Sequence, residues 1–144
     1  MKESPLKDAH IKRKAKLIDF AGYKLPAWFS SIRDEHMAVR QSVGIFDISH
    51  MQCFEFTGPA AASFLQYMSC NDLSKLPEQR CIYSMILNES GGILDDVMIT
   101  YNQNKYYMVV NASNGEKLWD WFQTHKTEDT QIKNLSLDHG FIAV

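Results

Sequence analysis

Short apolar runs follow one another along most of the chain, and clusters of turn-forming residues separate them. The clearest case is the segment 83–100, YSMILNESGGILDDVMIT, in which two apolar runs flank a turn at 90–92. The two glycines suit a tight hairpin turn, because glycine adopts positive φ without strain. A second turn at 102–104 precedes the apolar run KYYMVVNA. The pattern predicts a three-stranded antiparallel unit with strands at 81–88, 92–101 and 105–112.

Apolar residues at helical spacing predict helices in other segments. Two of these segments follow a serine that has an acidic residue three positions later, Ser31 with Asp34 and Ser113 with Glu116, a spacing typical of a capping box. The predicted helices are 5–16, opening at Pro5; 32–43, ending at Gly44; 59–70, with Pro59 in its first turn; and 113–125.

Further strands complete the predicted fold. We expect strands at 17–20, stopping at Gly22, at 45–57 and at 133–137, with a break at Pro26, a turn at 138–140 and the start of another strand at 141–144. Helices that flank a run of hairpin-connected strands predict an α+β fold, an antiparallel sheet with helices packed on one face. A length of 144 residues predicts a single domain.

Composition restricts the classes of function. The chain is 45% apolar and 22% charged with a formal net charge of −2, which argues against general nucleic-acid binding. A basic cluster at 7–16 has no interleaved aromatic residues and is typical of a solvated helix face. No apolar run approaches the roughly 18 residues of a membrane span, and the N-terminus has no signal-peptide core. We therefore expect a cytoplasmic protein that binds neither nucleic acid nor membrane.

The cysteines and histidines predict no metal site. Cys53, Cys70 and Cys81 are odd in number, lack CxxC spacing and lie in apolar surroundings, which favours reduced thiols in the core. The five histidines show no HxH or HxxxH spacing.

Two adjacent aspartates in the predicted second strand are the strongest candidates for chemistry. Because successive side chains of a strand point to opposite faces, Asp96 shares a face with Leu94 and Met98, and Asp95 takes the other face. Both faces carry apolar residues, so each carboxylate must be hydrogen-bonded, paired with a cation or neutral. Such an environment is typical of catalytic carboxylates. Alternatively, one aspartate closes the hairpin through backbone N–H groups and the other lies in water on an edge strand.

Long ordered motifs give the chain a family resemblance. Residues 19–51 contain DFAGYKLP, EHMAVR and GIFDISHM, and residues 83–100 contain NESGGILDD. With the segment VVNA at 109–112, these motifs resemble the T-protein of the glycine cleavage system, an aminomethyltransferase, over nearly the whole chain. The resemblance implies an enzyme that transfers the methylene carbon of an aminomethyl group from the lipoyl arm of the partner H-protein to tetrahydrofolate, releasing ammonia.

The resemblance also implies roles for individual residues. Asp96 becomes the catalytic residue, which orients or activates the folate nitrogens and contributes to folate binding. Met51, Tyr83 and Asn111 become folate-site residues. The alternative for Met51 and Tyr83 is plain core packing, and for Asn111 a turn residue that bonds the backbone. The polar residues of the FDISHM motif, Asp47, Ser49 and His50, are interpreted as structural hydrogen-bonding groups at a strand start.

The chain departs from the family pattern in two turns and in length. Lys14-Ala15-Lys16 stands where a Gly-Ala pair is common, and Glu78-Gln79-Arg80 replaces a glycine-containing turn. Family members are more than twice as long, and further folate-holding residues lie in their later part. We therefore expect residues 1–144 to be the N-terminal portion of such an enzyme, with little activity without the polypeptide beyond Val144.

Two other functions stay open. One is a non-catalytic or regulatory folate-binding module of the same fold. The other is an interaction domain that uses its terminal strand for β-augmentation, which leaves the paired aspartates unexplained.

Overall fold

The computed structural model describes residues 1–136 and 139–144 and divides the chain into two compact units. Unit 1 is Met1–His50 with Leu137–Val144, and unit 2 is Met51–Ser136. The length had predicted one domain. Each unit has its own sheet, which makes the two-unit description the better one.

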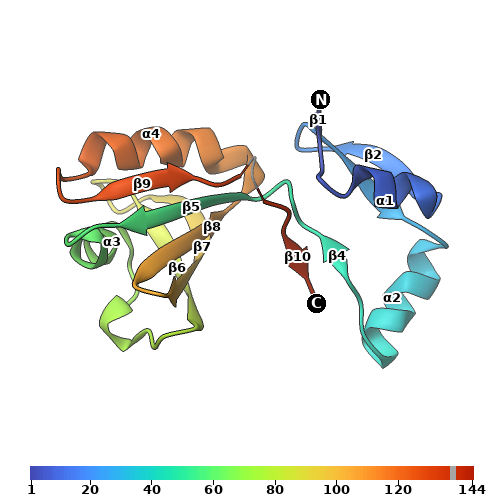
Figure 1. Cartoon of the computed structure of the whole chain (residues 1–144), viewed down its shortest axis with the longest axis horizontal. Coiled ribbons are helices and arrows are strands. Elements are labelled where there is room, and N and C mark those ends of the chain that lie inside the picture. Colours follow the sequence, from blue (N-terminus) through green and yellow to red (C-terminus); the bar gives the residue numbers. More distant parts are fainter. Residues whose placement is uncertain (137–138) are drawn as a thin grey trace. The chain divides into compact units, whose positions relative to one another are not determined.

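Unit 2 contains an antiparallel five-stranded sheet with the order β6-β7-β8-β5-β9 (Figure 1). The strands are β5 (Gln52–Thr57), β6 (Arg80–Leu87), β7 (Ile93–Asn102), β8 (Lys105–Val110) and β9 (Gln131–Asn134). The predicted three-stranded unit is confirmed in β6, β7 and β8, and β5 and β9 extend it on one side.

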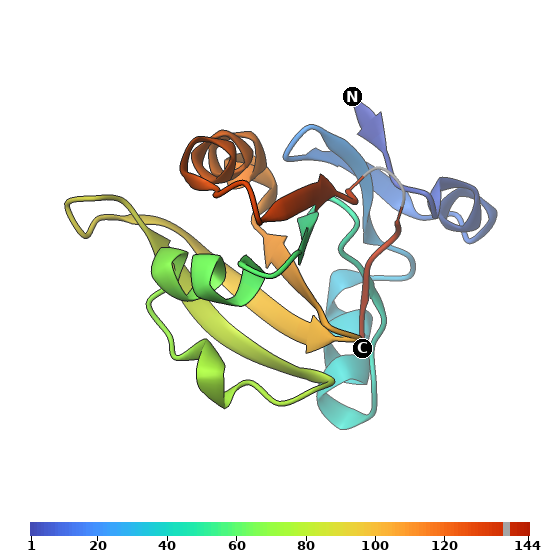
Figure 2. The same ribbon diagram turned by 60° about the vertical axis from the view of Figure 1, so that its left-hand side comes forward.

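The β6–β7 hairpin closes at the predicted turn. Asn88 N–H donates to the Gly92 carbonyl over 2.8 Å, and Gly91 adopts φ 82°. The Asn88 side chain accepts from the backbone N–H of Ser90 and of Gly92, so an asparagine closes the turn and neither aspartate is needed for it. Figure 2 shows the tip of this hairpin projecting beyond the rest of the sheet.

Two helices, α3 (Ala61–Met68) and α4 (Gly115–His125), pack on one face of this sheet. Apolar side chains of both helices share a single core with the inward-facing residues of the strands; it includes Phe54, Phe56, Phe64, Leu65, Ile86, Ile99, Met108, Leu118 and Phe122. Two short 3-10 turns, η1 (Leu73–Lys75) and η2 (Ala112–Asn114), lead into β6 and α4. The predicted α+β class with helices on one face is confirmed.

The predicted cap of α4 is wrong. Ser113 lies inside η2, and the residue before the helix is Asn114, which makes no side-chain capping bond. Asn114 instead donates to Asp95 over 2.6 Å, so this turn is held from the sheet rather than by a local capping box.

Unit 1 is built around a small sheet with the order β1-β3-β2. Its strands are β1 (Lys2–Glu3), β2 (Lys16–Phe20) and β3 (Tyr23–Trp28), with β1 parallel to β3 and β2 antiparallel to it. The predicted break at Pro26 is wrong, because Pro26 lies within β3. Because β1 pairs only with Tyr23 and Lys24, β3 has a partner on one edge alone at Pro26, where a residue without an N–H is tolerated.

The helices of unit 1 are α1 (Lys7–Lys12) and α2 (Ile32–Gln41), both shorter than predicted. The Ser31 cap is confirmed, since its hydroxyl accepts from Asp34 N–H over 3.1 Å. The residue that reaches back to the preceding backbone is Glu35, which accepts from the N–H groups of Phe29 and Ser30 over 2.6 Å each.

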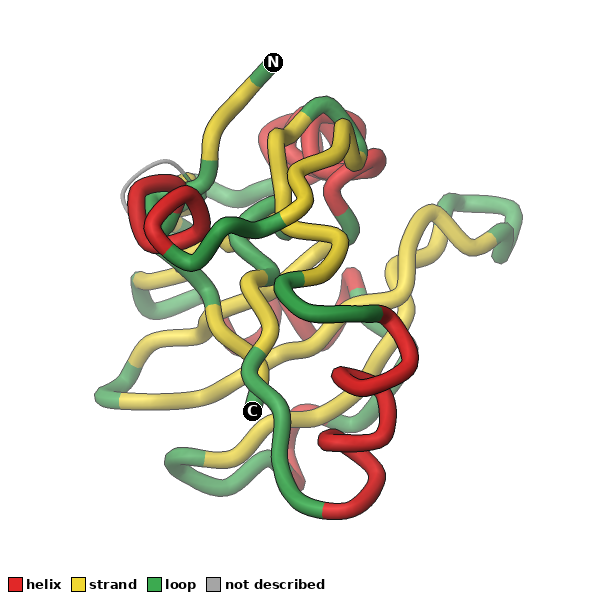
Figure 3. Tube along the Cα trace, turned by 90° about the vertical axis from the view of Figure 1, so that its right-hand side faces the viewer, coloured by secondary structure: helices red, strands yellow, loops and turns green. Residues whose placement is uncertain are grey.

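The predicted strand 45–57 is in fact two strands in separate sheets. β4 (Phe46–Asp47) pairs with β10 (Ile142–Ala143) in unit 1, whereas β5 belongs to unit 2. Figure 3 shows the loop after α2 turning back to enter β4 beside the C-terminal residues. Of the predicted C-terminal elements, the strand lies earlier, in β9, and positions 137 and 138 lie outside the described residues.

Asp47 holds the interior of unit 1 together. Its carboxylate accepts from the Ser4 hydroxyl and from Ser49 N–H, and His10 Nε2 lies 2.6 Å from it. Ser4, His10 and Ser49 are buried. Burial alone raises the pKa of Asp47, but these hydrogen bonds outweigh burial and hold the pKa below its usual value. The structural role predicted for this motif is confirmed for Asp47.

No helix in the described part of the chain is both long and apolar enough to cross a membrane.

Candidate functional site

Asp96 lies on the face of the unit 2 sheet that carries no helix. In the β6–β7 register it is opposite Met85, and the next pair on the same face is Tyr83 opposite Met98. Tyr83 and Met98 are exposed, at 54% and 42%, and this cross-strand pair offers apolar surface beside the carboxylate. Strand alternation therefore places Asp95 and Asp96 on opposite faces, as the sequence predicted, and the Asp96 face is the one away from the core.

Two side chains hold the Asp96 carboxylate in place. The Tyr83 hydroxyl donates to Oδ2 over 3.2 Å, and the Asn111 side-chain amide donates to Oδ1 over 2.9 Å. Asn111 directly follows β8, the neighbouring strand on the other side of β7. The site thus draws one residue from each of three adjacent segments of the sheet and brings together three of the four predicted site residues.

Asp95 anchors the same site from inside. It is only 4% exposed, and its carboxylate accepts from Asn111 N–H, the Asn111 amide and the Asn114 amide over 3.0, 2.9 and 2.6 Å. A buried carboxylate is stable only with such partners. Asp95 fixes the turn that presents Asn111, and Asn111 in turn holds Asp96.

The environment predicted for Asp96 is wrong. Both faces of β7 carry apolar residues in the sequence, yet Asp96 is exposed, because no element of unit 2 covers its face. Desolvation therefore acts on Asp95 and not on Asp96. The core-packing alternative for Tyr83 is also wrong, since more than half of its side chain is exposed.

The pKa of the Tyr83 phenol is raised above its ordinary value. Partial desolvation raises its pKa, and the hydrogen bond to Asp96 and the negative charges nearby raise it further. Tyr83 therefore stays protonated at neutral pH and serves as a hydrogen-bond donor.

Met51 lies one residue before β5 and is half-buried. Gln52 pairs with Val110 in the β5–β8 register, so continuing this register by one residue sets Met51 opposite Asn111. Met51 therefore extends the row of residues that runs from Met85 through Asp96 to Asn111.

Asn114 is the residue of the site that the sequence prediction missed. Its side chain bonds Asp95 over 2.6 Å. The signal is the spacing of two asparagines, Asn111 and Asn114, around a short turn after a strand; from the sequence only Asn111 is interpreted as a turn residue, before the Ser113 cap.

The other candidate groups do not assemble into a site. Within residues 1–136 and 139–144, no cluster of three or more His, Cys, Asp or Glu side chains is placed to hold a metal ion. All three cysteines are free; Cys53 is buried as predicted, whereas Cys70 and Cys81 are exposed, against the prediction of core thiols.

Comparison with known proteins gives this geometry a family. The model of the GCVT N-terminal domain matches residues 6–144. The aminomethyltransferase of Thermotoga maritima is 44% identical over 99% of this chain and 40% of its own length, and that of Thermotoga petrophila is 45% identical over the same shares. The crystal structure of glycine cleavage system aminomethyltransferase T from Bartonella henselae superposes with a TM-score of 0.86 at 33% identity, covering 94% of this chain and 38% of that one.

This chain therefore spans about 40% of the length of the curated relatives that it matches. The family match covers nearly all of it, including both aspartates and Asn111. The chain belongs to the GCVT N-terminal domain family, the N-terminal portion of glycine cleavage system aminomethyltransferases.

Proposed function

We propose that this chain provides the catalytic carboxylate and part of the tetrahydrofolate site of an aminomethyltransferase of the glycine cleavage system. The observation that carries the proposal is the hydrogen-bonded position of Asp96 between Tyr83 and Asn111, on a face that is open to a ligand. The aminomethyltransferase relatives support the class of reaction.

Asp96 suits the proton chemistry of this reaction. When the methylene carbon moves to the two nitrogens of tetrahydrofolate, both N–H protons are lost, one leaving with ammonia and one with the lipoyl sulfur. A carboxylate that accepts a hydrogen bond from a folate N–H orients that nitrogen and stabilises the positive charge that develops on it. Tyr83 and Asn111 each use one oxygen of Asp96, and each oxygen has a further lone pair for the substrate.

The surroundings of Asp96 suit the flat, aromatic part of a folate. Tyr83 and Met98 offer an aromatic and a polarisable apolar surface beside the carboxylate. Met51 and Asn111 border the same area on the opposite side of Asp96. A pterin presents ring faces to the first pair of residues and N–H donors to the carboxylate.

The openness of the site fits a reaction whose donor is carried by another protein. A carbon attached to the lipoyl arm of H-protein must reach the acceptor from outside, and Asp96 is accessible on the sheet face. We place this reaction in the cytoplasm, as expected from the sequence.

The test is tetrahydrofolate-dependent release of ammonia from aminomethylated H-protein. We compare the 144-residue chain with an extended polypeptide, in which Val144 is joined to the part of the Thermotoga maritima relative that the match leaves uncovered. A folate pocket needs several convergent polar groups, so we expect turnover from the extended polypeptide and little or none from the chain alone.

An extended polypeptide that binds tetrahydrofolate without turnover would replace the proposal with the alternative of a non-catalytic folate-binding module. Full turnover by the 144-residue chain would show that the remaining segments are not needed for catalysis.

A further inference from the structure

Unit 1 has little core of its own. Among its described residues, Tyr23 and Leu25 are the only buried apolar side chains, and most of the exposed large apolar side chains of the whole described chain belong to this unit. Unit 2, by contrast, buries a large continuous core. Soluble proteins rarely leave a contiguous apolar surface of this kind without a partner.

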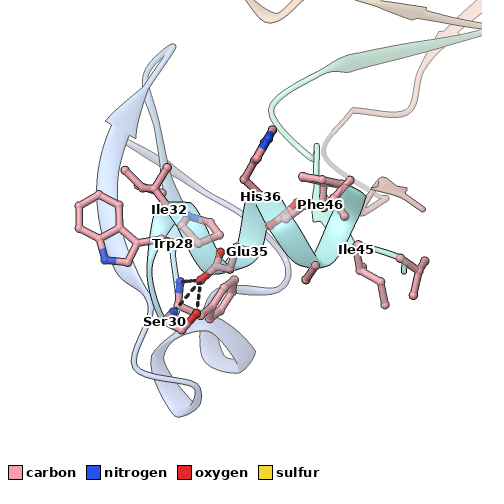
Figure 4. A pocket seen from close by; sticks show the side chains of 15 residues that line it. Trp28, Ser30, Ile32, Glu35, His36, Ile45 and Phe46 are labelled. Carbon is pink, nitrogen blue, oxygen red and sulfur yellow. Dashed lines mark hydrogen bonds between the residues drawn. The ribbon is translucent and has the colours of Figure 1, made fainter. Parts of the chain in front are cut away.

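Much of this apolar surface forms one groove. It encloses about 570 Å³ between the end of β3, helix α2 and the segment 43–47 (Figure 4). The apolar side chains that line it include Trp28, Ile32, Val39, Val43, Ile45 and Phe46. In Figure 4, Trp28 and Ile45 lie at opposite ends of the groove, with α2 between them.

Helix α2 contributes an exposed apolar face to this groove. Its apolar residues recur at helical spacing, yet no residue of the helix is buried, and Ile32 is 67% exposed. An amphipathic helix of a globular protein packs its apolar stripe against other elements. Both partly buried acidic residues that line the groove are already hydrogen-bonded. Glu35 accepts from Phe29 and Ser30, and Asp47 accepts from Ser4 and Ser49. The groove therefore fits an apolar occupant.

The direction of β10 indicates what this occupant is. β10 runs antiparallel to β4 with Ile142 opposite Asp47 and Ala143 opposite Phe46. One further step of this register sets Val144 opposite Ile45. A polypeptide that continued in this direction would pass Gly44 and Val43, which line the groove.

The relatives contain further polypeptide that is long enough to supply an occupant, because about 60% of their length lies outside the region that this chain matches. We propose that the groove is an intramolecular docking site: an apolar strand from that unmatched part of an aminomethyltransferase continues β10 antiparallel along residues 45–43, and its side chains cover α2. A second copy of this chain is the competing occupant, and the test separates the two.

The test measures cysteine labelling in the groove. In a Cys70→Ser, Cys81→Ser background, Val43→Cys and, separately, Ile45→Cys are treated with N-ethylmaleimide in the 144-residue chain and in the extended polypeptide described above. The matched control is Tyr67→Cys on α3 of unit 2, a position that is 81% exposed. The labelling rate is followed by mass spectrometry.

We expect the labelling of both groove cysteines to slow by about tenfold or more in the extended polypeptide, since thiol reactivity follows exposure. Labelling at position 67 should change little. Equal rates at positions 43 and 45 in the two polypeptides would overturn the proposal. Protection of these positions in the 144-residue chain, together with a dimer in sedimentation analysis, would give the groove to a second copy and would also overturn it. The labelling result is independent of aminomethyl transfer.

Discussion

The side-chain nitrogen of Asn111 lies 2.9 Å from Oδ1 of Asp96. The same amide lies 2.9 Å from Oδ1 of the buried Asp95, so one side chain joins the exposed carboxylate to the interior of unit 2. This link means that Asp95 and Asp96 have different tasks although they are adjacent in sequence. Asp95 fixes the position of Asn111, and Asp96 is presented to the ligand.

The first prediction separates these tasks in the extended polypeptide. Asp96→Asn keeps the size and one acceptor of the side chain but loses the charge and the ability to take a proton. General acid–base participation contributes roughly 10²- to 10⁴-fold, so we expect kcat to fall by that order with a smaller change in KM. Steady-state ammonia release measures both constants.

Asp95→Asn is the comparison. Asp95 accepts three hydrogen bonds in a buried position, so the asparagine side chain leaves at least one donor unpaired. We expect Asp95→Asn to lower the thermal midpoint more than Asp96→Asn does, and to lower kcat less. Equal kcat losses in the two variants, or a larger loss in Asp95→Asn, would show that Asp96 is not the catalytic carboxylate and that the proposal has chosen the wrong face of β7.

The second prediction concerns the ring of Tyr83. Tetrahydrofolate binding to the 144-residue chain, measured by calorimetry, should weaken in Tyr83→Ala, because the exposed ring beside Asp96 is lost. Tyr83→Phe keeps the ring and removes only the 3.2 Å bond to Asp96, so it should bind more tightly than the alanine variant. Tyr67→Ala, on an exposed position of α3, is the control. A Tyr83→Ala variant that binds like the wild type would remove Tyr83 from the site.

The third prediction concerns thiol reactivity. Burial, with a smaller contribution from the Glu55 charge, raises the pKa of Cys53 to about 11. At pH 8 a disulfide reagent should therefore modify Cys70 and Cys81 quickly. Cys53 should react more slowly by a factor of about 10² or more, because the thiolate is the reactive form. In the Cys70→Ser, Cys81→Ser variant only the slow phase should remain. A fast phase in that variant would contradict the burial of Cys53.

The fourth prediction concerns the stability of unit 1 in acid. The pKa of Asp47 is lower in the folded chain than its ordinary value of 3.8, so the folded state binds its proton less well than the unfolded state. The stabilisation is complete above pH 3.8 and is lost as the pH falls through the lowered pKa of the folded chain. Thermal melts between pH 6 and pH 2 should show Asp47→Asn less stable than the wild type at the high end and the two converging at the low end. A difference in midpoint that stays constant over this range would exclude the linkage.

Local patterns predicted the hairpin, the helices of unit 2 and the separation of Asp95 from Asp96, because strand alternation and helical spacing depend on neighbouring residues. The burial of each face could not be predicted in this way. Both faces of β7 look apolar in sequence, and only the packing of α3 and α4 on one of them decides that Asp95 is buried and Asp96 exposed.

The two turns that depart from the family pattern show what local sequence does not reveal. Lys14 and Gln79, in the two segments where the family resemblance implies a glycine, adopt φ values of 57° and 59°. The left-handed backbone is adopted without glycine, because the elements on either side, α1 and β2 for Lys14 and η1 and β6 for Gln79, fix where the chain must turn. Likewise, the split of residues 45–57 into β4 and β5 depends on the pairing of β4 with β10, which lies almost one hundred residues away.

The last prediction concerns Gly58, which ends β5. Its φ of 100° is unfavourable for any residue with a side chain, and a Cβ built there would lie 2.2 Å from the Asp129 carbonyl oxygen. Gly58→Ala must therefore both strain the backbone and displace the segment that leads into β9, and we expect it to lower the free energy of unfolding by about 3 kcal/mol or more. Gly91→Ala separates the two contributions, since Gly91 has φ 82° but nothing within 4 Å of its added Cβ, and strain alone should cost about 1–2 kcal/mol. Urea denaturation followed by far-UV circular dichroism measures both variants. Losses of equal size would show that Asp129 moves aside freely and that the contact between β5 and the loop before β9 is not rigid.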